Sequence, residues 1–162
     1  MRTEPAAVRR CEHRIEKADL LCEISNLAYV AADVSEGKED PHTLHQTYDI
    51  CEAGNIGRVE SMMRLAAVQA GAVVAEAGRL IMTDDAVILR IRGVPKYLTD
   101  KIVGETREFM TASVLHGWLS VTLPSAAGFW QTRKEELLAE LSETVGAATL
   151  PMRAFPRRLP PI

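Results

Sequence analysis

Apolar residues in this chain recur mainly every three or four positions, and this spacing limits the fold more than any other feature of the sequence. In "ADLLCEISNLAYVAADV", residues 18–34, the apolar positions step by four, three, four and three. Positions with this spacing share one face of a helix. They are Leu20, Ile24, Leu27, Ala31 and Val34. We therefore predict a first helix from Arg14 to Val34, with this stripe packed against a core.

Four later segments predict further helices. A short helix opens at Asp40-Pro41, because aspartate can cap the first amides and proline has no amide to lose there. Residues 56–78 repeat the helical stripe with several alanines, which let two helices approach closely. A long helix runs from Pro95 to Pro124, since proline cannot continue a helix. The last helix runs from this bend to Gly146.

The period changes once along the chain. In "AVILRIRGV" the residues alternate, with Val87, Leu89 and Ile91 on one face and Arg90 with Arg92 on the other, as in a strand. The segment "RLIM" precedes it across a polar turn. This arrangement predicts a β-hairpin, and its outward arginines indicate an edge strand or a protruding arm.

These segments together predict a mostly α-helical fold, a bundle of four to five helices in one domain of residues 1–146. The short β-hairpin or arm covers about 80–92, and residues 147–162, with four prolines, predict an extended C-terminal tail. A chain of 162 residues is ordinarily one domain. Trp118 and Trp130 flank Pro124, so we interpret this stretch as a packed corner between helices and not as a binding site.

Catalytic and metal-binding patterns are scarce in the sequence. The best metal candidate is His42 with His45, one helical turn apart, with Asp49 or Glu52 as a third ligand. No second ligand pair accompanies them, so we expect no metal and no cofactor. The sequence also lacks a phosphate-binding glycine loop and a nucleophile paired with a base. We therefore predict that the protein is not an enzyme.

Net charge and cysteine content limit the expected partners and cellular location of the protein. The formal net charge of -3 provides no overall attraction for nucleic acid, although arginines gather near both ends of the sequence. Three cysteines form no disulfide framework, and we expect Cys51 to be buried as a small apolar residue. We find no apolar run typical of a signal peptide or a membrane helix. We expect a cytoplasmic protein, or a virion component, without a membrane partner.

Three segments resemble small uncharacterised proteins of Bacteroidales prophage type. They are "SNLAYVAADV", "HTLHQTYDICEAGNIGRV" and "VLHGWLSVTLPSAAGFWQTRKEELLAEL", within about residues 18–145. The resemblance implies a virion assembly protein, similar to helical head–tail connector or head-completion proteins that work as rings of identical subunits. It brings no catalytic residues with it.

The leading hypothesis is therefore a non-enzymatic structural or assembly protein that acts by self-association. We expect it to contact copies of itself and other assembly proteins through the hairpin and the tail. The candidate partner-binding residues are Arg90, Arg92, Arg153, Phe155, Arg157 and Arg158. The alternative is a helical nucleic-acid-binding regulator or adaptor that uses its terminal arginines, and its affinity would fall steeply with salt.

Overall fold

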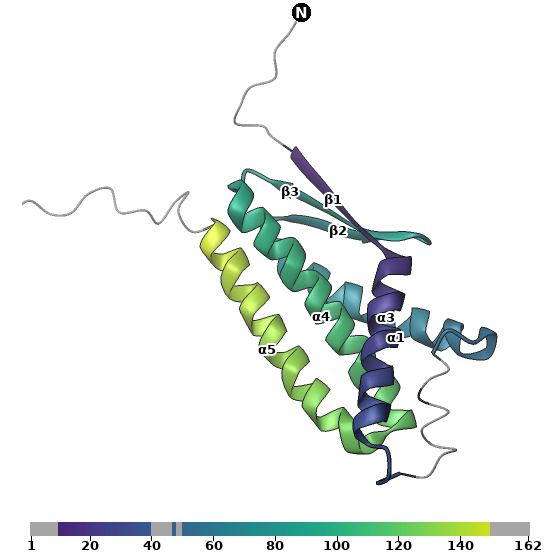
Figure 1. Cartoon of the computed structure of the whole chain (residues 1–162). Coiled ribbons are helices and arrows are strands. Elements are labelled where there is room, and N and C mark those ends of the chain that lie inside the picture. The colour runs from purple at the N-terminus through teal and green to yellow at the C-terminus, as the bar shows by residue number, and fades with distance from the viewer. Residues whose placement is uncertain (1–9, 40–46, 48–49, 150–162) are drawn as a thin grey trace, which may run out of the picture.

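The structure is a computed structural model and describes residues 10–39, 47 and 50–149. Four helices and three strands lie in these residues, so the fold is mostly α-helical with a small sheet. In chain order they are β1 (Arg10–Glu16), α1 (Lys17–Val34), α3 (Ala53–Val74), β2 (Gly78–Met82), β3 (Ala86–Arg92), α4 (Lys96–Thr122) and α5 (Pro124–Thr149). The sheet lies at one end of the helical bundle (Figure 1).

The predicted hairpin exists as β2 and β3, but β3 is the central strand of a three-stranded antiparallel sheet. β1 pairs with its other edge along seven positions, from Arg10 opposite Arg92 to Glu16 opposite Ala86. The prediction of an edge strand or a protruding arm is therefore wrong. β1, which lies about seventy residues earlier in the sequence, covers the edge of β3 that the hairpin alone would leave open.

The predicted start of the first helix at Arg14 is wrong. Residues up to Glu16 belong to β1, and α1 begins at Lys17. Ile15 is buried, whereas Arg14 and Glu16 on either side of it are exposed. A period of two residues suits a strand that has one face against a core. The backbone N–H of Lys17 donates to the carbonyl oxygen of Asp85 at 2.8 Å, which ties the corner between β1 and α1 to the hairpin turn.

The core lies between the inner face of the sheet and the four described helices. The buried residues of the sheet include Ile15, Val87, Leu89 and Ile91, as the alternation in β3 predicts. On α1 the buried residues are Leu20, Ile24, Ala28 and Ala32. The predicted stripe is thus correct for its first two members and shifted by one position for the next two. Its last predicted member, Val34, is 67% exposed.

The helix ends differ from the predictions at several points. α3 already begins at Ala53, so Gly54 lies inside its first turn. Cys51, just before it, is exposed, contrary to the expected burial. α5 continues to Thr149, past the glycine at which we ended it. The short helix predicted after Asp40-Pro41 lies largely outside the described residues.

The bend between α4 and α5 falls at Leu123, directly before Pro124, as predicted. The two long helices lie side by side (Figure 1). Trp118 is buried, and its indole N–H donates to the carbonyl oxygen of Thr47 at 3.2 Å. Phe129 is 66% exposed and meets Trp130 edge to face, with ring centroids 5.0 Å apart. Trp118 is therefore fully buried at the corner, whereas Trp130 is only partly buried against the same core.

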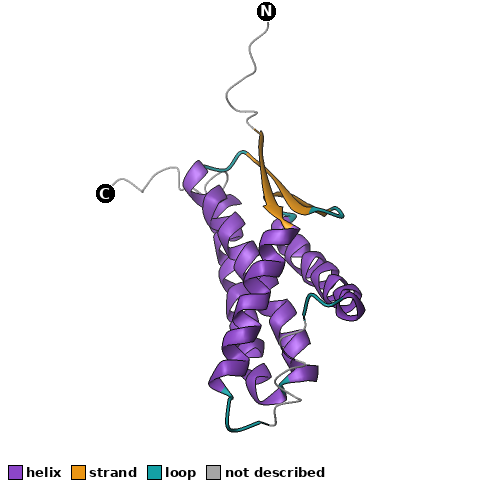
Figure 2. Cartoon of the chain, turned by 45° about the vertical axis from the view of Figure 1, so that its right-hand side comes forward, coloured by secondary structure: helices purple, strands orange, loops and turns teal. Residues whose placement is uncertain are grey.

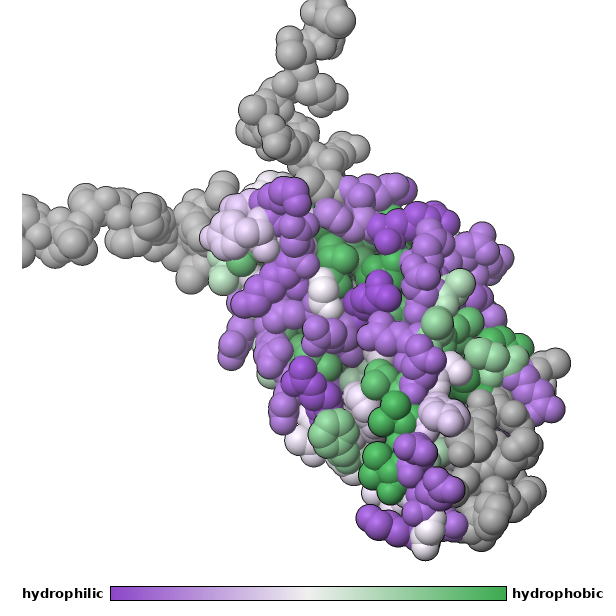
Figure 3. Space-filling view, in the orientation of Figure 1, coloured by the Kyte–Doolittle hydropathy of each residue, from purple (hydrophilic) through white to green (hydrophobic). Residues whose placement is uncertain are grey.

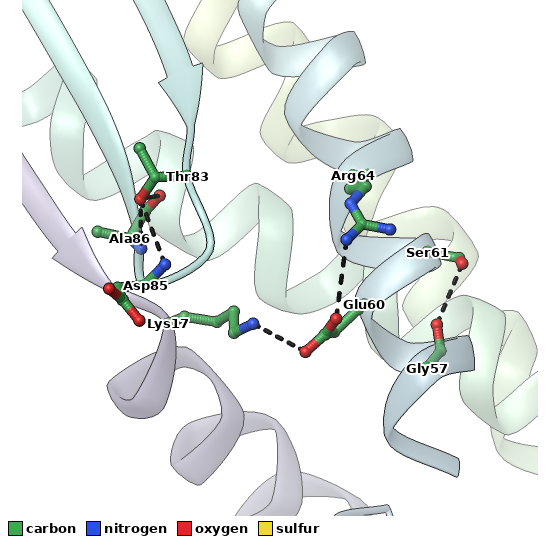
Figure 4. Close-up of polar contacts among 8 residues, drawn as sticks. All are labelled: Lys17, Gly57, Glu60, Ser61, Arg64, Thr83, Asp85 and Ala86. Atoms are coloured by element: carbon green, nitrogen blue, oxygen red, sulfur yellow. Dashed lines mark hydrogen bonds and ion pairs between the residues drawn. The ribbon is translucent and has the colours of Figure 1, made fainter. Parts of the chain in front are cut away.

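Polar contacts link the start of α1 to α3, and others close the hairpin turn (Figure 4). The ammonium of Lys17 donates to Glu60 at 2.8 Å, and Arg64 lies 3.8 Å from the other oxygen of that carboxylate. The hydrogen bond from Lys17 lowers the pKa of Glu60, and the charge of Lys17 lowers it further. In the hairpin turn the hydroxyl of Thr83 accepts a hydrogen bond from the backbone N–H of Ala86 at 3.0 Å.

Replacing Gly78 tests the sheet directly. A Cβ at this position would lie 2.0 Å from the carbonyl oxygen of Arg90, so Gly78→Ala must displace β2 from β3. We expect a loss of about 2–4 kcal/mol in the free energy of unfolding, measured by urea denaturation. In Gly104→Ala, in α4, the new methyl group meets nothing within 4 Å. In this matched variant the free energy of unfolding should rise by up to about 1 kcal/mol, because alanine has the higher helix propensity. Equal effects of the two substitutions would contradict the close contact between β2 and β3.

Candidate functional site

The outer face of the sheet points away from the helices, and it carries charged side chains beside the partly exposed Ile81 and Ile88. The register places Glu12, Arg90 and Arg79 in one row across β1, β3 and β2. Arg14 and Arg92 lie on the same face, because they are two residues from Glu12 and Arg90 along their strands. All five side chains are exposed. Figure 2 shows the strands at the end of the bundle, and Figure 3 shows hydrophilic side chains over much of that end.

A shallow recess of about 880 Å³ opens where this face meets the end of α3. Three of its lining side chains are arginines from β2 and β3, and two are glutamates. The lining consists of Glu12, Ala75, Glu76, Ala77, Gly78, Arg79, Arg90, Ile91 and Arg92. The recess therefore draws on β2, β3 and the chain just after α3, and β1 contributes Glu12 to it.

The three arginines differ in their partners. Arg90 donates to Glu12 at 2.8 Å, across two paired strands. Within the described residues, Arg79 and Arg92 have no carboxylate at ion-pair distance. Arg79 also stands directly opposite Arg90, and like charges in that position destabilise a sheet. The recess thus holds three arginines and two glutamates, and within the described residues two of these guanidinium groups form no ion pair.

This arrangement favours the binding of an anionic group. A guanidinium offers several N–H donors in a plane that matches a carboxylate or a phosphate. The described lining has no serine, cysteine or histidine that could act as a nucleophile or exchange a proton near neutral pH. The chemistry available to these side chains is therefore recognition of negative charge.

Neighbouring charged groups do not extend this site. Arg14 lies on the same face, but it donates to Glu16 at 2.6 Å, and this hydrogen bond raises the pKa of Arg14 above its ordinary value. His116 lies on α4, outside the recess, and burial lowers its pKa, with a further contribution from the charge of Lys134. In the part of the chain that the structure describes, no three metal-ligating side chains gather at one place.

The residues expected to bind partners have separate outcomes. Arg90 and Arg92 do lie together, on the exposed face of the sheet. Arg153, Phe155, Arg157 and Arg158 lie outside the described residues, as do His42 and His45.

Three contributors to the recess, Glu12, Glu76 and Arg79, were missed from the sequence. Arg79 could have been found from the register, because Asp84 and Asp85 form the tip of the hairpin turn and set Arg79 opposite Arg90. The place of Glu12 in the recess could not have been found from local patterns, because it depends on the long-range pairing of β1 with β3.

Comparison of the chain with protein-family models, curated proteins and solved structures finds no match. None of the described helices combines the length and apolar character needed to span a membrane.

Arg79→Gln tests whether the Arg79 side chain contributes to the stability of the fold. Because Arg79 has no described carboxylate partner and opposes Arg90, we expect the thermal midpoint of the variant to equal or slightly exceed that of the wild type. Arg90→Gln removes the cross-strand ion pair with Glu12. Both side chains of this pair are exposed, so the free energy of unfolding should fall by at most about 1 kcal/mol. A marked destabilisation by Arg79→Gln would show that this arginine supports the fold.

Proposed function

We propose that the protein is a non-enzymatic assembly protein that associates with itself, and that the arginine-lined recess is one of its contact surfaces. The observation that carries this proposal is that Arg79 and Arg92 are exposed on the outer face of the sheet and have no carboxylate partner among the described residues. Such groups bind negative charge, and the chain itself supplies 22 acidic residues. A second copy can therefore provide the complementary surface.

The prophage setting rests on the sequence resemblance alone. Connector-like proteins work as rings, and a contact between two different surfaces of identical subunits produces a ring when the rotation closes. A basic recess that receives an acidic surface is a contact of this kind. It supports the assembly hypothesis without specifying the number of subunits or the other virion components.

The test is the molar mass of the protein in solution, by light scattering at micromolar and at tenfold higher concentrations. We expect the wild type to form a defined oligomer, and R79E/R92E to associate at least about tenfold more weakly, because two attractive contacts become repulsive. K38E/K134E makes the same change in net charge outside the recess and should associate like the wild type. A wild type that stays monomeric throughout would refute the proposal.

Nucleic-acid binding is the second candidate, and the same unpaired Arg79 and Arg92 favour it. In that case a DNA or RNA probe should shift in a gel at low salt, and the affinity should fall steeply as salt rises. Arg14, one of the arginines near the N-terminal end of the sequence, is paired with Glu16 and is therefore less available to a phosphate. A shift that R79E/R92E abolishes, together with a monomeric wild type, would favour this function over self-association.

A further inference from the structure

A second charged surface lies between the first half of α4 and the last third of α5. It is a groove of about 370 Å³ with three glutamates and one lysine in its lining. Glu105 and Lys101 come from α4, and Glu140 and Glu143 from α5. Among the described residues, Lys101 forms no ion pair with any of them, so the groove keeps an excess of negative charge.

Glu105 is the residue of the groove that most lacks a hydrogen-bond donor. Its Oε1 atom is buried, and no hydrogen-bond donor of the described structure reaches it. A buried carboxylate oxygen without a donor is unfavourable, and a cationic N–H group is the partner that relieves this most. The hydroxyl of Thr144, also in the lining, already donates to the carbonyl oxygen of Glu140 at 3.0 Å. Lys101 lines the same groove but does not donate to this atom, so an arginine of a docked segment is a candidate for the missing donor.

The chain contains a segment of matching charge close to one end of this groove. The described residues end at Thr149, two positions after Ala147, which lines the groove. Residues 150–162 carry three arginines and no acidic residue. Fully extended, thirteen residues reach about 43 Å, which is ample to cross a groove some two helical turns long. Arginine is also the side chain that best matches a carboxylate, because its planar donors can bind both oxygens.

The direction of the groove favours a segment from another molecule. From Ala147 the groove runs back along α5 toward Glu140, so the segment of the same chain would have to reverse at its first residues. A segment that arrives from a second copy needs no such reversal.

We propose that residues 150–162 of one copy dock in the α4–α5 groove of a neighbouring copy, with an arginine bound at Glu105 and others along Glu140 and Glu143. This inference rests on the proposed self-association and names a second contact for it. Each subunit then gives its C-terminal segment to one neighbour and receives one from another, or two copies exchange segments.

Charge exchange between two full-length variants tests the contact. E140R/E143R makes the groove basic and R157E/R158E makes the segment acidic, so each variant alone should associate at least about tenfold more weakly than the wild type by sedimentation velocity. In an equimolar mixture the basic groove meets the acidic segment, while the two unchanged surfaces also meet. We expect the mixture to recover mixed oligomers, which a contact within one chain cannot produce.

E135R/E136R is the matched control, because it makes the same charge change on α5 outside the groove and should associate normally. Circular dichroism and the thermal midpoint establish that each variant is folded. A wild type that associates while both charge variants associate equally well would overturn the docking inference and leave the proposed function standing. A mixture that fails to recover, or a control that also dissociates, would overturn it as well. A monomeric wild type would refute the proposed function and this contact together.

Discussion

The pairing of β1 with β3 is the contact on which the rest of the structure depends. It joins residues 10–16 to residues 86–92 through a seven-residue antiparallel register. It buries Ile15 opposite Val87 and so closes the core over the ends of the helices. It also places the corner before α1 at the hairpin turn, where Lys17 bonds to Asp85 and Glu60. Without this pairing the hairpin would present an open edge, and α1 would lose the contact that fixes its start.

The same pairing gives the molecule its exposed charged face. Each strand alternates, so every side chain that faces the helices has neighbours that face away from them. On β3 this puts Leu89 and Ile91 in the core and Arg90 with Arg92 outside it. β1 then adds Glu12, which pairs with Arg90, and β2 adds Arg79, which has no described carboxylate partner. The arrangement is poorer for stability than a sheet with paired charges would be, which is the pattern expected where residues are retained for binding.

The sequence predicted what depends on local periodicity. The long helices, the bend at Pro124 and the buried face of β3 follow from spacing and from proline chemistry over short distances. It did not predict β1, because "RCEHRIE" has a single large apolar residue and precedes a strong helical stripe. Only a partner seventy residues away makes that segment a strand. For the same reason Arg90 and Arg92 were named as a surface, whereas Glu12 and Arg79, which complete it, depend on pairing that local patterns do not encode.

The central claim is that copies of the protein meet at the recess, and arginine footprinting tests it most directly. Phenylglyoxal modifies accessible arginines, and mass spectrometry reports the rate at each position. Arg107, which is 40% exposed on α4 and lines neither the recess nor the hollow that Arg79 shares with α3, serves as the internal reference. If copies meet at the recess, Arg79 and Arg92 react more slowly as rising concentration drives association, while the rate at Arg107 stays constant. Oligomers in which Arg79 and Arg92 react as fast as in the dilute protein would contradict it.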